Sequence, residues 1–248
     1  MTKKHSRDTR LYVAGYDLSG DANALTLPRP RDLIEATAFG DTGEKNIVGP
    51  SRGSFSIDAM FDDTSGMDAA LNAWLSEQIA SFWPAGEAAG AFGVGSSQTI
   101  LEGYPYSSRV ADIVKVTANG RINGIPYRIK SLAAKQTVTA QTNSPSIDDG
   151  AASAGAGPGV FICHVTAISA TGGSERWRAR LQHSADNAAW SLAENHLFTN
   201  ADGIQAKYVL FTAPSTPIGG LFERYVRLQM DLEATTGSIT YQASYVRL

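Results

Sequence analysis

The sequence predicts a mainly β protein built from two domains. Apolar and polar residues alternate with a period of two in many short segments, which is typical of strands with one buried face. Only one segment has the three- and four-residue spacing of a helix, and clusters of Gly, Asn, Asp and Pro separate the segments. The length of 248 residues suits two domains, since domains commonly contain about 100–200 residues.

Residues 53–62 give the clearest strand. Phe55, Ile57, Ala59 and Phe61 fall on one face, because successive side chains of an extended chain point to opposite sides. The other face is polar, so we expect a strand that is buried on one side. Further segments share this alternation with varying regularity: 10–18, 111–118, 161–168, 177–183, 208–212, 222–232 and 238–246.

The exception to the β pattern follows this strand. Apolar residues recur there at helical spacing, at Met67, Ala70, Leu71, Trp74, Leu75, Ile79 and Phe82. Asp63, Thr64 or Ser65 can cap the start, and Pro84 ends the pattern. We expect one helix over about 67–83, lying across a sheet face.

Two short signals predict turns and one longer segment predicts a linker. The pairs Asn119–Gly120 and Asn123–Gly124 tolerate the positive φ of tight hairpin turns. Residues 143–159 are rich in Gly, Ala and Ser and have no periodicity. We therefore predict a β domain with the helix over 1–145, a linker over 146–159, and a C-terminal β-sandwich of jelly-roll or immunoglobulin-like type over 160–248.

Charge and composition exclude several classes of protein. Lys and Arg number 21 against 24 Asp and Glu, so the net charge is -3 and lacks the basic excess of a protein that binds nucleic-acid phosphates. A single cysteine excludes an internal disulfide or a multi-cysteine zinc site. No apolar run approaches the roughly 18–20 residues that span a bilayer, and the N-terminus has no secretory pattern, so we expect a soluble protein without membrane insertion.

The chain contains residue types used in catalysis, but not in a catalytic pattern. Residues 49–53 match G-x-S-x-G, yet a strand follows them where a serine hydrolase needs a helix. His183, Ser184 and Asp186 are neighbours at a strand end and cannot form a relay unaided. We expect a hairpin loop at the first motif, a turn at the second, and no enzyme activity.

Metal and cofactor sites are not predicted. Asp58, Asp62, Asp63 and Asp68 lack the glycine and the terminal glutamate of a calcium loop. Cys163 alternates with apolar neighbours, which is typical of a small core residue.

A row of three arginines is the most distinctive polar feature. Arg176, Arg178 and Arg180 share one face of a predicted strand. They could meet phosphate, a sugar acid or the carboxylates of a partner protein on the outer surface. We favour a solvated sheet face, with Glu175 or Glu233 as partners.

Part of the sequence resembles the opening of tail tube proteins from long-tailed bacteriophages. The resemblance lies in LYVAGYDLSG (11–20), AFGD (38–41) and GPSRGSFSIDAMFD (49–62). The segments LQHSAD (181–186) and ERYVRL (223–228) are similar to the β-sandwich module often appended to such proteins, and to carbohydrate-binding sandwiches.

The resemblance implies a structural virion protein with a tail-tube-like N-terminal sandwich or barrel. Such chains form rings, here hexameric or alternatively trimeric, that stack into a tube for DNA ejection. The implied location is the phage tail, assembled in the bacterial host cytoplasm. The implied partners are further copies of the chain, the tape measure and the tail terminator, with non-specific passage of DNA.

The same resemblance suggests which residues meet in the tube. The N-terminal arm of residues 1–10 and a polar loop of residues 40–52 are the expected ring and stacking contacts, through Arg7, Arg10, Asp41, Glu44, Lys45 and Arg52. Ser56, Asp58 and Asp62 are the expected lumen-facing residues, since a weakly acidic lumen does not hold DNA phosphates.

A different class of function is open at this stage. The chain could be a surface-binding or decoration protein whose C-terminal sandwich recognises cell-surface carbohydrate. Trp190, Tyr208 and the arginine row would then be its contacts.

Overall fold

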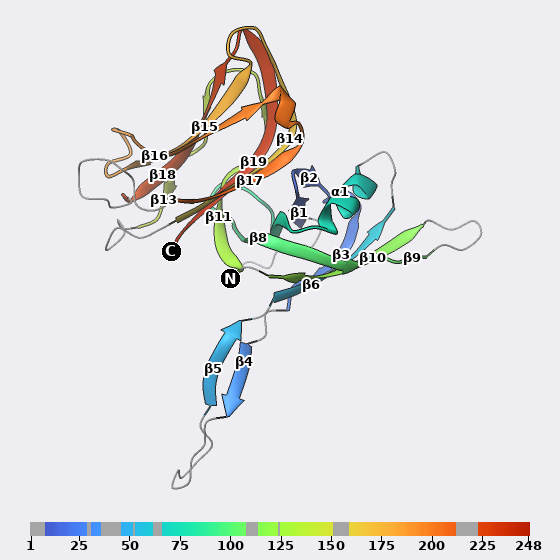
Figure 1. Cartoon of the computed structure of the whole chain (residues 1–248). Coiled ribbons are helices and arrows are strands. Elements are labelled where there is room, and N and C mark those ends of the chain that lie inside the picture. The colour runs from blue at the N-terminus through green and yellow to red at the C-terminus, as the bar shows by residue number, and fades with distance from the viewer. Residues whose placement is uncertain are drawn as a thin grey trace. The chain divides into compact units, whose positions relative to one another are not determined.

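The computed structural model describes residues 8–28, 31–35, 46–51, 53–61, 66–107, 114–123, 125–150, 159–211 and 223–248 (Figure 1). Contacts divide the chain into two compact units. The first unit comprises Met1–Ser19, Ile79–Gly95 and Tyr127–Leu248, and the second comprises Gly20–Gln78 and Ser96–Pro126. All strand pairs with a defined register are antiparallel, which confirms the mainly β fold class.

The first unit contains two large sheets. The order of strands in one is β17 (Gln205–Phe211), β14 (Gly159–Thr171), β19 (Thr236–Arg247), β11 (Tyr127–Val138) and the start of β8 (Phe92–Gly103). The order in the other is β12 (Thr142–Asn143), β18 (Tyr225–Glu233), β15 (Arg176–Ser184) and β16 (Ser191–Thr199), and β13 (Ile147–Asp148) also pairs with β18. A short 3-10 helix, η2 (Asn200–Asp202), joins β16 to β17.

The two sheets enclose a sandwich core. Phe161, Tyr241 and Leu132 from one sheet and Trp177 and Leu228 from the other belong to one cluster of fully buried side chains. The indole N–H of Trp177 donates to a backbone carbonyl, so its polar atom is satisfied as its ring is buried. The first unit therefore contains a β-sandwich, which includes β11, β12 and β13 in addition to strands of the predicted 160–248 domain.

A third layer covers the outer face of β14. The first seven residues of this strand are all buried, which requires apolar contacts on both faces. Val160 and Ile162 pack with Tyr12 and Trp83 in a second cluster. Those aromatic residues come from β1 (Arg10–Val13) and β7 (Gln78–Trp83), which pair with each other, while β2 (Tyr16–Asp17) pairs with β1.

The second unit is a sheet covered by the helix. The order of strands is the later part of β8, then β10 (Lys115–Ile122), β6 (Gly53–Met60) and β3 (Ala22–Thr26), and β9 (Tyr106–Ser107) pairs with β10. In β6, Phe55, Ile57 and Ala59 are buried and alternate with more exposed residues, as predicted. Trp74 of α1 (Met67–Trp74) stacks on the Phe55 ring with centroids 4.6 Å apart.

A separate two-stranded ribbon completes the second unit. It consists of β4 (Arg31–Glu35) and β5 (Asn46–Ser51), which pair with each other (Figure 1). The expected loop over 40–52 is therefore wrong for residues 46–51, which form a strand.

The helix is shorter than the sequence predicts. It ends at Trp74, with Leu75 as its C-cap, and the expected helical residues 78–83 form strand β7. The apolar residues of β7 are buried on both sides, so their spacing does not distinguish a strand from a helix. Gly66 is the N-cap, and the expected caps at 63–65 lie outside the described residues.

The two compact units differ from the predicted division at 146–159. β11 pairs with β19, and β12 and β13 pair with β18, so residues 127–148 belong with the C-terminal strands. Residues 10–19 and 79–95 join the same unit because β1 and β7 cover β14. The start of the expected linker forms β13, and residues 151–158 lie outside the described part of the chain.

One predicted turn is the middle of a strand. Asn119 and Gly120 lie within β10, at a shift in its register with β8. Glycine is needed there for a close approach, since a Cβ at position 120 would lie 2.2 Å from the Phe55 ring and 2.3 Å from the Ile100 carbonyl oxygen. The other predicted turn includes Gly124, which lies outside the described residues.

The substitution Gly120→Ala should destabilise the protein by about 1–3 kcal/mol, because the Phe55 ring and a backbone carbonyl must move. The measurement is the urea midpoint monitored by tryptophan fluorescence. Gly103→Ala is the matched control in the same sheet, since a Cβ there meets nothing within 4 Å. Equal midpoints for the two variants would contradict the close packing of Phe55 on Gly120.

Candidate functional site

The second unit ends in a strand edge that has no partner among the described residues. β3 is the last strand of its sheet and pairs with β6 on one side. Its sequence, ANALT, has no charge and no proline, the features with which monomeric proteins usually protect an edge. Asn23, Ala24 and Thr26 are exposed. Within the described part of the chain, this edge is a candidate for pairing with another chain.

The ribbon of β4 and β5 has no third strand among the described residues. Its register pairs Leu33 with Val48 and Ile34 with Ile47. An isolated two-stranded hairpin is marginally stable in water, which makes this ribbon a candidate for contact with another molecule.

The first unit presents exposed aliphatic residues on its own edge strands. β16 and β17 each end the order of their sheet. Leu192 and Leu197 of β16, Ile204, and Leu210 of β17 are 37–56% exposed. These residues extend the list of candidate contact surfaces beyond those that the sequence suggested.

The expected stacking residues are described in part. Arg10 lies on β1, and its Nε is 3.9 Å from a carboxylate oxygen of Glu87. The remaining expected contacts lie outside the described residues: Arg7, Asp41, Glu44, Lys45 and Arg52.

Two of the expected lumen residues lie on the polar face of β6. Ser56 is half-buried, and Asp58 is exposed and accepts a hydrogen bond of 2.8 Å from the Thr117 hydroxyl on β10. Asp62 lies outside the described residues. Their place in a lumen stays a prediction.

The three arginines of β15 have carboxylate partners on β18. The Nε atom of Arg176 donates to Glu233 at 2.6 Å, and Arg178 pairs with the same carboxylate. Arg180 lies 3.1 Å from Asp231. The hydrogen bond from Arg176 is the main reason that the pKa of Glu233 is lowered. Glu233 is the partner that the sequence suggested, whereas Asp231 lies opposite Arg178 in the strand register and pairs diagonally with Arg180.

The residues suggested for carbohydrate contact also have partners within the chain. The guanidinium of Arg227 lies 4.0 Å from the centroid of the Trp190 ring, so one face of the indole is covered. Tyr208 lies beside Tyr127, with ring centroids 6.3 Å apart.

The residues with catalytic chemistry have structural contacts. The Ser184 hydroxyl donates to Asp186 at 2.9 Å, and the same carboxylate oxygen accepts from two backbone amides of the turn. His183 Nδ1 lies 3.3 Å from a carboxylate oxygen of Glu223 instead. This is the expected strand end and turn. Residues 49–53 belong to the end of β5 and the start of β6 where they are described.

Cys163 and His164 are both buried in the first unit. Burial raises the pKa of the Cys163 thiol, as expected for a core residue. His164 Nε2 lies 2.9 Å from the Ser81 hydroxyl, and burial lowers the pKa of its imidazole to about 3.

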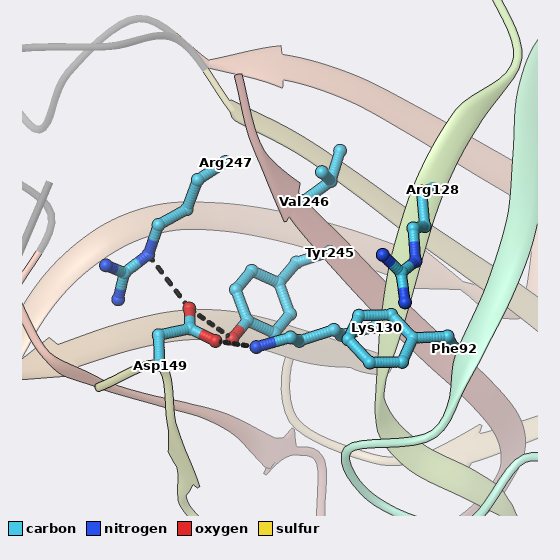
Figure 2. Close-up of a pocket in the computed structure, with 7 residues that line it drawn as sticks. All are labelled: Phe92, Arg128, Lys130, Asp149, Tyr245, Val246 and Arg247. Atoms are coloured by element: carbon cyan, nitrogen blue, oxygen red, sulfur yellow. Dashed lines mark hydrogen bonds and ion pairs between the residues drawn. The ribbon is translucent and has the colours of Figure 1, made fainter. Parts of the chain in front are cut away.

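A pocket of about 270 Å³ opens on the first unit (Figure 2). Strand register creates it, because Lys130 of β11 is the partner of Phe92 on β8 and of Tyr245 on β19. Arg128 lies two residues from Lys130 and thus on the same face. The lining residues are Phe92, Arg128, Lys130, Asp149, Tyr245, Val246 and Arg247.

Asp149 organises the base of this pocket. Its side chain is 10% exposed, forms an ion pair with Lys130, and lies 3.0 Å from Arg247 Nε. The Tyr245 hydroxyl donates to it at 2.7 Å, and burial followed by the Asp149 charge raises the pKa of that phenol. Sequence reasoning missed this pocket, although the alternating cations in YRIK (127–130) were a visible signal.

The described segments contain no group of three or more His, Cys, Asp or Glu side chains that could hold a metal ion. Within the same segments, no helix reaches the length and apolarity needed to span a membrane.

Comparisons with known proteins do not assign this chain to a family. No protein-family model matches the chain, and no curated protein matches it. Among solved structures, one similar chain belongs to a structure titled "Virion of native gene transfer agent (GTA) particle". The TM-score is 0.40 at 12% identity, over 51% of this chain and 98% of that chain. A similarity at this level establishes neither a shared fold nor a shared function.

The buried His164 should make stability depend on pH. Its pKa is about 3 when folded and about 6.5 when unfolded, so below pH 6.5 the unfolded chain binds one more proton. The free energy of unfolding should therefore decrease as the pH is lowered, by up to about 1.4 kcal/mol per pH unit. Unfolding in urea at several values between pH 7 and pH 5 measures this slope. In His164→Gln, the slope should be smaller by the contribution of one proton. An unchanged slope in this variant would show that His164 does not cause the pH dependence.

Proposed function

We propose that this chain is a structural virion protein that assembles into the tail tube of a long-tailed bacteriophage. Copies join side by side into rings, hexameric by preference and trimeric as the alternative, and the rings stack into a hollow conduit for DNA ejection. The tube meets the tape measure and the tail terminator, and it is assembled in the host cytoplasm. The role is mechanical, and no catalysis is proposed.

The observation that carries this proposal is the uncharged edge of β3, which has no partner strand among the described residues. The backbone N–H and C=O groups of such an edge are suited to pairing with a strand of another copy. When the β3 edge of each copy pairs with a different edge of the next copy, the contact is head to tail. If the rotation between successive copies closes the circle, the result is a ring without open edges. The sequence resemblance to tail tube proteins supports the same assembly.

Stacking between rings is assigned to the ribbon of β4 and β5 and to the N-terminal arm. The ribbon has aliphatic register pairs and no third strand among the described residues. A neighbouring copy would give it the cover that a two-stranded hairpin lacks. Arg7, Arg10, Asp41, Glu44, Lys45 and Arg52 are the proposed polar contacts.

The lumen is assigned to the polar face of β6. Asp58 is exposed there, and Ser56 shares its face by alternation. Asp62, which lies outside the described residues, is the third proposed lumen residue. With a net charge of -3, the chain has no basic excess to retain DNA phosphates during passage. The carbohydrate-binding alternative is not proposed, because Trp190 and the arginine row are engaged within the chain.

Negative-stain microscopy of the concentrated protein tests the assembly, and we expect rings or tubes. Thr26→Lys places a positive charge on the β3 edge of every copy, which should raise the concentration at half assembly about fivefold. Ala69→Lys adds the same charge at an exposed position of α1 and should leave assembly unchanged. A wild-type protein that stays monomeric at millimolar concentration would overturn the proposal.

Stacking can be separated from ring closure. Ile47→Asp puts a charge into the ribbon, so we expect single rings to persist and tubes to disappear, because the charge would lose water on stacking. Leu75→Asp is the control, since Leu75 is 50% exposed at the end of α1. Tubes of normal length from Ile47→Asp would show that the ribbon does not mediate stacking.

A further inference from the structure

We propose that the pocket between β8, β11 and β19 binds the phosphate group of a small phosphate monoester. This inference concerns the first unit alone and does not rest on the proposed assembly. It starts from a concave site of about 270 Å³ that three cations line, two of which contact one carboxylate (Figure 2).

The charges of the pocket do not cancel. Arg128, Lys130 and Arg247 contribute three positive charges, and Asp149 is the one acid among the lining residues. The formal charge of the lining is therefore +2. A phosphate monoester carries about -1.5 to -2 at neutral pH, so it balances this charge better than a carboxylate or a phosphodiester does.

The carboxylate holds two of the cations in place. Asp149 pairs with Lys130 and with Arg247, and the Tyr245 hydroxyl donates to its Oδ2 atom at 2.7 Å. Its side chain is nearly buried, which keeps these contacts away from water. The lysine and arginine heads are thus fixed before any ligand arrives, and this preorganisation lowers the entropy lost on binding.

Arg128 is the cation available to the ligand. Its guanidinium lies 3.9 Å from the centroid of the Phe92 ring, and no carboxylate partner is recorded for it among the described residues. Stacking on a ring orients the guanidinium plane and leaves its N–H groups able to donate in its plane. A phosphate can accept two such hydrogen bonds at once.

The apolar part of the ligand is expected against Phe92. This side chain is 44% exposed, an unusual position for a large apolar group beside cations. The volume suits a small organic phosphate and excludes a duplex, which cannot enter a pocket of this size. Free phosphate, a sugar phosphate and a nucleoside monophosphate share the required chemistry.

Equilibrium dialysis with radiolabelled inorganic phosphate tests the site in the full chain, whether assembled or not. At pH 7.5 and low ionic strength we expect saturable binding of one phosphate per chain, with acetate competing at least about tenfold more weakly. Ribose 5-phosphate and adenosine monophosphate, as competitors, identify the organic part. Absence of saturable binding, or competition by duplex DNA alone, would overturn the proposal.

The matched variants are Arg128→Gln and Arg121→Gln. Arg128→Gln should weaken phosphate binding about tenfold or more, because it removes a charged donor pair from the ligand. Arg121→Gln makes the same charge change on β10, where the side chain is 70% exposed and paired with Glu102, and should leave binding unchanged. Thermal melting checks that both variants fold. Equal losses in the two variants would mean general charge attraction, which contradicts a built site.

Discussion

The structure depends on the need of every strand to pair its backbone N–H and C=O groups. Inside each unit, antiparallel ladders satisfy this need, and the side chains between them exclude water. Among the described residues, the ladders stop at β3, β16 and β17. The sequence of β3 contains neither a charge nor a proline that would protect its outer edge. In the proposed assembly, backbone hydrogen bonds of the kind that form within one chain would also form between chains.

β14 shows how this requirement joins distant parts of the sequence. It pairs with β17 and β19, buries Phe161 against the second sheet of the first unit, and buries Ile162 beneath β1 and β7. A strand covered on both faces has no solvated side and therefore no polar alternation. Three stretches of chain, separated by the two segments of the second unit, consequently share one compact unit.

The sequence predicted strands correctly where one face of the strand is exposed to solvent. β6 and β15 alternate as expected because their outer faces carry Ser, Asp and Arg. The prediction failed at β7, because a strand that is buried on both faces has no polar alternation, and its apolar spacing also fits a helix. The pocket was also missed, since Phe92, Lys130 and Tyr245 become neighbours only through the register of three strands. Long-range pairing of this kind has no local signature.

The discontinuity of the first unit has a consequence for the order of events during translation. The second unit ends at Pro126, so all of its strands leave the ribosome before the last segment of the first unit, Tyr127–Leu248. β1 and β7 emerge early as well, but β14, which they cover, pairs with β19, and that strand ends at Arg247. Domains generally fold as units as the nascent chain emerges. The first unit can therefore close only after β19 has been made, so β1 and β7 have no complete sheet to cover while residues 127–247 are synthesised.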